Sequence, residues 1–144
     1  MPRVQDCSKS RLMAVRPFAS PPGPAQDPVW SPDGSLIAYA GASVGPYAPL
    51  LATRPDGTPV EFPKIEMLVG GARARFLPGG KSLVGLVAAQ DFWILDLETM
   101  KTRQLAHLIN SATVRTFDIT PDGKQIVFDR LRENSDIVLI DLPK

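Results

Sequence analysis

The sequence of 144 residues has very little of what covalent staples and metal centres require: one cysteine, Cys7, and one histidine, His107. A single cysteine excludes a disulfide within the chain, and a single histidine excludes a multi-histidine metal site. We therefore expect no cofactor and no metal. Cys7 has no histidine beside it and is predicted to be a free surface thiol, and His107 a solvated or core-edge side chain.

Charge of one sign and long apolar runs are also lacking. The 16 basic and 15 acidic residues give a formal charge of +1, so composition offers no electrostatic case for a nucleic-acid partner. Residues 1–17 contain five charged side chains and no apolar run long enough for a signal peptide or a membrane span. We expect no membrane partner, and a cytoplasmic location if Met1 is the true start.

The chain is instead rich in residues that make turns. Fifteen prolines and eleven glycines argue against long helices and for many short segments, while 44% hydrophobic residues are enough for a packed core. This combination favours an all-β fold.

A short motif occurs three times with the same order of residue types. The first residue is apolar and the second is small or apolar. The third is Pro, the fourth is Asp or Gly and the fifth is Gly, and a short strand follows. The copies are Trp30-Ser31-Pro32-Asp33-Gly34, Phe76-Leu77-Pro78-Gly79-Gly80 and Ile119-Thr120-Pro121-Asp122-Gly123. Proline fixes φ at the first central turn position and glycine takes the left-handed conformation that follows, so each copy predicts a tight hairpin.

Two of the segments between these turns, 92–97 and 137–142, are apolar at consecutive positions rather than alternating. A strand of this kind needs cover on both faces. Sheets stacked face to face around an axis provide that cover, and the spacing of the prolines, 46 and then 43 residues, matches the roughly 40 to 45 residues of a four-stranded propeller blade. Phe92 and Trp93 are predicted to pack between blades.

The repeat resembles the TolB-type, WD-like Pro-Asp-Gly repeat of bacterial β-propellers over residues 27–144. Trp30, Tyr39, Phe76 and Phe128 stand at the aromatic positions of that family's blades, whereas Gly79 replaces the usual Asp. The resemblance implies blades of four antiparallel strands, which we place at 27–62, 72–108 and 113–144. Residues 1–26 form an amino-terminal segment and proline-rich linker.

Three blades are fewer than the usual ring of about four to eight. The third has no fourth strand, for which 11–15 is the available candidate. Each end sheet would expose an apolar face of about 500 Å², worth of the order of 10 kcal/mol at about 25 cal/mol per Å². Either two chains form a six-bladed homodimer, or these residues are the carboxy-terminal part of a longer propeller.

Two catalytic motifs match the sequence but not its expected structure. Gly41-Ala42-Ser43-Val44-Gly45 fits G-x-S-x-G, with Asp96 and His107 in hydrolase order, yet the following Pro46 and Pro49 exclude the helix that this motif requires. Gly79-Gly80-Lys81-Ser82 resembles the end of a phosphate-binding loop, but Arg75 stands where the first glycine belongs. We predict no catalytic residues.

The function predicted from these observations is a non-enzymatic propeller module that binds a protein or peptide on its rim. The rim is expected from the loops between second and third strands and the segments that enter each first strand. The candidate contact residues are Tyr47, Arg75, Arg130, Arg132, Glu133 and Asn134. The alternative is the propeller portion of a larger enzyme or sensor, such as a propeller-bearing peptidase or a bacterial Ser/Thr kinase, with its catalytic domain outside this chain.

Overall fold

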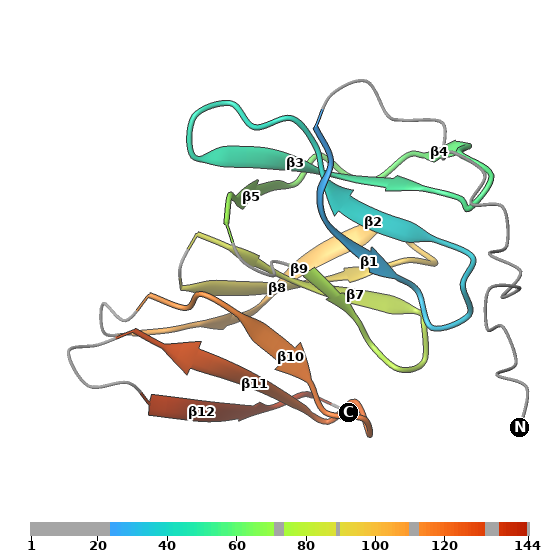
Figure 1. The fold of residues 1–144 in the computed structure, drawn as a ribbon. Helices are drawn as coiled ribbons and strands as arrows, with labels where there is room; N and C mark the ends of the chain where they lie inside the picture. The colour runs from blue at the N-terminus through green and yellow to red at the C-terminus, as the bar shows by residue number, and fades with distance from the viewer. Residues whose placement is uncertain (1–23, 71–73, 89, 110–112, 132–135, 144) are drawn as a thin grey trace, which may run out of the picture.

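The computed structural model describes residues 24–70, 74–88, 90–109, 113–131 and 136–143. Within these ranges the chain contains twelve β-strands and no helix, arranged as three antiparallel sheets that follow one another along the sequence (Figure 1). The fold is therefore an all-β partial propeller, as predicted. We name the sheets blade one, blade two and blade three in chain order.

Blade two has four strands, each paired with the next. They are β6 (Ala74–Phe76), β7 (Ser82–Val87), β8 (Asp91–Asp96) and β9 (Lys101–His107). The β8–β9 register shifts between Phe92 and Trp93, which marks a β-bulge in the outer pair.

Blade one is larger because its outer edge is made in two pieces. Its path is β1 (Gln26–Trp30), β2 (Ile37–Ala40), β3 (Tyr47–Thr53) and β4 (Pro59–Val60), and β5 (Glu66–Leu68) pairs with the other end of β3. Proline cannot donate a ladder hydrogen bond, and Pro63 lies between β4 and β5, where the edge is interrupted. The sheet thus extends past residue 62.

Blade three consists, in its described residues, of β10 (Phe117–Ile119), β11 (Gln125–Arg130) and β12 (Asp136–Asp141). The candidate closing strand at 11–15 lies outside the described residues.

The three Pro-Asp-Gly copies all form the predicted hairpin turns. Gly34, Gly80 and Gly123 have φ of 71°, 70° and 69°. Their amides donate to the carbonyls of Ser31, Leu77 and Thr120, at 2.9, 2.8 and 2.8 Å. Successive turns also touch, because a Cβ added at Gly80 would stand 3.7 Å from Pro32 and one at Gly123 only 3.1 Å from Pro78.

Blade two separates two apolar cores. Leu83, Trp93 and Leu95 face blade one, where they pack with residues such as Leu50 and Met67. The alternate residues on the same strands face blade three and pack against its core, and they include Val84, Leu86 and Phe92. Phe92 stacks edge-on against Phe117, with ring centroids 5.2 Å apart. The consecutive apolar pattern of β8 is thus explained by burial on both faces, and the predicted packing of Phe92 and Trp93 between blades is confirmed.

The outward faces of the first and third blades carry exposed apolar side chains. On blade three, Ile137 and Leu139 lie opposite Asp129 and Val127 on the face that points away from the core. On blade one, Trp30 and Leu51 are exposed in the same way. Both faces have the apolar character of a blade surface that packs on another sheet.

Candidate functional site

One rim of the molecule gathers the loops between second and third strands and the segments that follow the outer strands. Backbone hydrogen bonds join these segments: the amides of Val69 and Leu108 donate to the carbonyls of Pro46 and Gln90 at 2.8 and 2.9 Å. In blade three the amide of Leu131 donates at 2.9 Å to the carbonyl of Thr113, in the segment between β9 and β10. We call this surface the loop rim and define it by described residues 41–47, 69–70, 88, 90, 108–109, 113–116 and 130–131. The Pro-Asp-Gly turns lie at the opposite rim (Figure 1).

Four large apolar side chains are exposed on the loop rim. They come from all three blades and are Val44 (84% exposed), Tyr47 (41%), Ile109 (77%) and Leu131 (44%). At the turn rim, among the residues the structure describes, the large apolar side chains in this exposed group are Met100 and, at the end of β1, Trp30. The apolar surface outside the two end faces is therefore concentrated where the loops meet.

Tyr47 is the first residue of β3 rather than part of a loop. The connection before it is shorter than expected because Gly45, with φ of 62°, closes a tight turn and Val44 pairs with Tyr47. The tyrosine side chain remains exposed at the loop rim.

Arg75 lies on β6 and connects two blades. Its Nη1 donates to the carbonyl of Ala74 at 2.8 Å, and its Nε lies 3.6 Å from Oδ1 of Asp118 on β10. Because the arginine is about two-thirds buried and the aspartate largely exposed, this ion pair adds little stability but holds the guanidinium near the first strand of blade three.

Arg130 ends β11, and its Nε is buried without a hydrogen-bond partner. Arg132, Glu133 and Asn134 lie outside the described residues. No hydrogen bond or ion pair links Tyr47, Arg75 and Arg130, all three of which are described, so the structure places them on separate blades rather than in one cluster.

A polar cluster that the sequence did not predict joins β8 to β9. Asp91 and His107 are direct partners in the register, and His107 Nδ1 lies 2.5 Å from Asp91 Oδ1. The same oxygen accepts a hydrogen bond from Gln104 Nε2 at 3.2 Å. Asp91 and His107 are sixteen positions apart in the sequence, so their pairing could have been predicted only from the register of β8 and β9.

The hydrolase reading of Ser43 is excluded by the placement of its supposed partners. His107 pairs with Asp91, whereas Asp96 accepts hydrogen bonds from the amides of Glu98 and Thr99 in a turn at the other end of β8. Those bonds, that from Thr99 foremost, lower the pKa of Asp96.

The segment that resembles the end of a phosphate-binding loop is a hairpin turn. Its Lys81 lies before the strand β7 rather than before a helix, with its Nζ 3.0 Å from Oε1 of Glu98.

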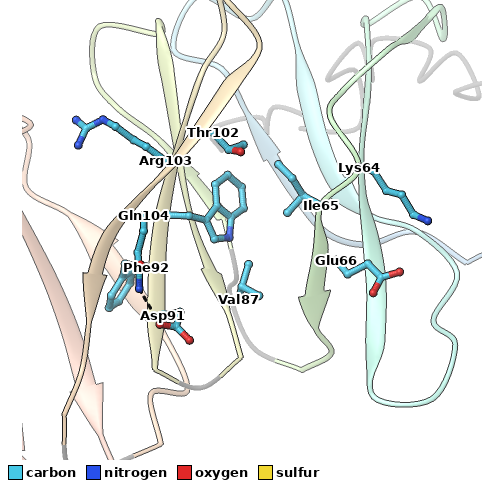
Figure 2. Close-up of a pocket in the computed structure, with 10 residues that line it drawn as sticks. Lys64, Ile65, Glu66, Val87, Asp91, Phe92, Thr102, Arg103 and Gln104 are labelled. Atoms are coloured by element: carbon cyan, nitrogen blue, oxygen red, sulfur yellow. Dashed lines mark hydrogen bonds between the residues drawn. The ribbon is translucent and has the colours of Figure 1, made fainter.

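A groove of about 720 Å³ separates blade one from blade two (Figure 2). Its lining comes from the split outer edge of blade one and from β7, β8 and β9 of blade two. The lining residues are Lys64, Ile65, Glu66, Val87, Asp91, Phe92, Trp93, Thr102, Arg103 and Gln104.

Trp93 is a large, buried side chain in this lining. It is 7% exposed, and its indole Nε1 is buried with no hydrogen-bond partner. The indole lies over Gly85, where a Cβ would come within 2.1 Å of the ring.

Within the described residues there is no group of three or more His, Cys, Asp or Glu placed to hold a metal ion. No helix among those residues has the length and apolar character needed to cross a membrane.

No protein-family model and no curated protein matches the sequence. Solved structures do match. TolB from Acinetobacter baumannii superposes with a TM-score of 0.61 at 25% identity, covering 83% of this chain and 30% of that one. A protein assigned as TolB from Agrobacterium tumefaciens gives 0.60 at 22% identity, covering 80% and 42%. An oligogalacturonate lyase in complex with manganese gives 0.60 at 20% identity, covering 83% and 35%.

These likenesses define the class of fold. The chain has a TolB-like β-propeller architecture, and its three sheets are propeller blades. It spans between 30% and 42% of the length of these structures. The similarity to the lyase, at 20% identity, concerns the fold alone.

Proposed function

We propose that this chain is a non-enzymatic propeller module that binds a protein or peptide on its loop rim. The observation that carries the proposal is the exposure of Val44, Tyr47, Ile109 and Leu131 on that rim. Exposed apolar side chains gathered on one surface and surrounded by polar groups are typical of protein interaction sites.

Polar groups with unused bonding capacity lie beside these apolar residues. The buried Nε of Arg130 has no partner, and a partner that supplies an acceptor there removes the cost of that unmade bond. Arg132, Glu133 and Asn134 follow directly in the sequence and remain proposed contacts. Arg75 is proposed to contribute through the positive charge it holds between blades two and three.

Site-specific photo-crosslinking tests the proposal. A benzophenone amino acid is placed at position 44 or 109, and in a control at the exposed Met100 on the opposite rim. After irradiation in a lysate of the source organism, the proposal expects one protein to be crosslinked from both 44 and 109 and not from 100. The crosslink should weaken by about tenfold when Leu131 is changed to Ser. Equal crosslinking from all three positions, or none from 44 and 109, would contradict loop-rim binding.

The alternative function is the propeller portion of a larger enzyme or sensor. It is favoured by one fact: the chain spans less than half of each matched structure. The coding sequence on either side distinguishes the two. An adjoining kinase or hydrolase segment would favour the alternative, whereas an in-frame stop before Met1 with its own start signal would favour the independent module.

A further inference from the structure

The groove between blades one and two has an apolar floor. Ile65 and Val87 lie on opposite sides of it and Thr102 lies at its upper end (Figure 2). Ile65 is buried and belongs to the core that also contains Trp93. The groove therefore continues the interblade core to the surface of the molecule, which gives an apolar side chain from outside a place to pack.

The buried indole N–H of Trp93 is the second feature. It is the donor of a nine-tenths buried side chain that lines the groove, and it has no acceptor. The indole cannot simply turn away, because it is held against Gly85 on β7. A buried donor without a partner costs free energy that an incoming acceptor recovers, so the site favours a ligand that brings a carbonyl oxygen.

The third feature is a free strand edge. In the described residues β9 pairs with β8 alone, and its first four residues, 101–104, are all exposed. Thr102, Arg103 and Gln104 of this strand line the groove. An edge with unpaired backbone N–H and C=O groups is a template for an extended chain. The bulge opposite Phe92 and Trp93 limits such pairing to the part of β9 that precedes it.

The charges on the groove are separated. The carboxylate of Asp91 lies at the end of the groove next to Val87, whereas Glu66 extends from β5 on the side away from Val87 and the guanidinium of Arg103 points away on the other side (Figure 2). The contacts of Gln104 and His107 both fall on Oδ1 of Asp91, and Asp91 is therefore the carboxylate that marks this end of the groove. A basic side chain entering from this end meets negative charge.

We propose that this groove binds an extended peptide segment of a partner protein, with an aliphatic residue followed closely by a lysine or arginine. The segment adds to the free edge of β9, and its aliphatic side chain packs on Trp93 and Ile65. A backbone carbonyl accepts from Trp93 Nε1, and the basic side chain pairs with Asp91. This inference rests on the proposed function, since it specifies the peptide partner and adds a second contact surface beside the loop rim.

Peptide selection against the full 144-residue chain tests it. A displayed library of random nonapeptides is enriched on the immobilised chain, and the dissociation constant of a labelled selected peptide is measured by fluorescence anisotropy. Trp93→Phe keeps an aromatic ring and removes the N–H, and it should weaken binding about tenfold. Asp91→Asn should weaken binding about threefold or more, and more at low salt. Trp30→Phe, which changes the other tryptophan, is the matched control and should leave binding unchanged.

The indole N–H resonance of Trp93 gives a readout that needs no substitution in the groove. It is assigned by comparing the spectrum of the unaltered chain with that of Trp30→Phe, and it should move downfield when the selected peptide is added, while the Trp30 resonance stays in place. A stationary Trp93 resonance would overturn the groove site. Peptides whose binding depends on Val44 and Ile109 but not on Trp93 would overturn it too, while supporting the loop rim. Enrichment of no peptide would also overturn the groove site, and the crosslinking experiment would still judge the loop rim separately.

Discussion

Gly85 and Trp93 are direct partners across β7 and β8, and the indole of Trp93 occupies the space in which a side chain at position 85 would stand. A Cβ at this position would lie 2.1 Å from Cζ2 and 2.4 Å from Cε2 of the ring. Glycine in the middle of a central strand normally weakens it, but here the missing side chain makes room for the largest residue of the blade-one interface.

Gly85→Ala should therefore lower the free energy of unfolding by about 2–3 kcal/mol, because the methyl group overpacks a confined core. Urea denaturation followed by fluorescence measures this. Gly79→Ala is the control: no atom lies within 4 Å of the added Cβ, so the change should be within about 0.5 kcal/mol. Adding Trp93→Leu to Gly85→Ala should cost less than the sum of the two single changes, and simple additivity would contradict the packing account.

The three hairpin glycines form a graded series. Gly34, Gly80 and Gly123 share a φ near +70°, but the space around the added Cβ differs: nothing within 4 Å, Pro32 at 3.7 Å and Pro78 at 3.1 Å. Alanine at each position pays the left-handed strain of about 1 kcal/mol. Gly123→Ala should destabilise further, because the turn of blade two must yield. If Gly34→Ala and Gly123→Ala lowered the urea midpoint of unfolding by the same amount, the result would show that the turns do not stack.

Acid should weaken the fold through its turn aspartates. Hydrogen bonds, from the Ser31 hydroxyl first and then the Ser35 amide, lower the pKa of Asp33 from its ordinary 3.8 to about 2. The Thr120 hydroxyl and Lys124 amide lower the pKa of Asp122 in the same way. A carboxyl group whose pKa is lower in the folded chain than in the unfolded chain stabilises the fold at pH values above its unfolded pKa of about 4. This contribution is lost as the pH falls towards about 2.

Urea midpoints should therefore decrease between pH 4 and pH 2, and Asp33→Asn with Asp122→Asn should flatten the decrease. The second turn should contribute nothing to this acid sensitivity, because Leu77 and Gly79 stand where the other two turns have the hydroxyl and the carboxylate. An unchanged slope in the double variant would mean that other groups carry the acid sensitivity.

The outward faces of blades one and three should cause self-association. Ile137 and Leu139 are 78% and 55% exposed on one end face, and Trp30 is 53% exposed on the other. Light scattering of the 15.6 kDa chain should show mass increasing with concentration. Leu139→Lys should reduce this increase, whereas Met100→Lys on the turn rim should not. A chain that stays monomeric at high concentration would contradict the end-face account and the proposed six-bladed homodimer alike.

Much of the fold was predictable because local chemistry decides it. Proline and glycine specify the hairpin turns at 31–34, 77–80 and 120–123 whatever their surroundings, and the consecutive apolar residues of β8 require two covered faces. The split edge of blade one was not predicted, because β5 contains only three residues and follows a proline-interrupted stretch with no periodic pattern of its own.

The candidate sites were less accessible to sequence reasoning. Tyr47 and Arg130 were chosen from loops and Arg75 from a segment that enters a first strand. Pairing of Val44 with Tyr47 moves the tyrosine into a strand, and Asp118 contacts Arg75. The Asp91–His107 pair and the unpartnered indole of Trp93 depend on register and on the small volume of Gly85. Neither leaves a local signal in the sequence.

The central claim, that blade two is a sheet packed on both faces by its neighbours, is tested most directly by amide hydrogen exchange of the monomeric 144-residue chain. The account predicts the slowest exchange in β7 and β8, whose side chains enter both cores, and faster exchange in β12 and β1, which border a single core. Protection of β12 or β1 that equals or exceeds that of β7 and β8 would contradict it.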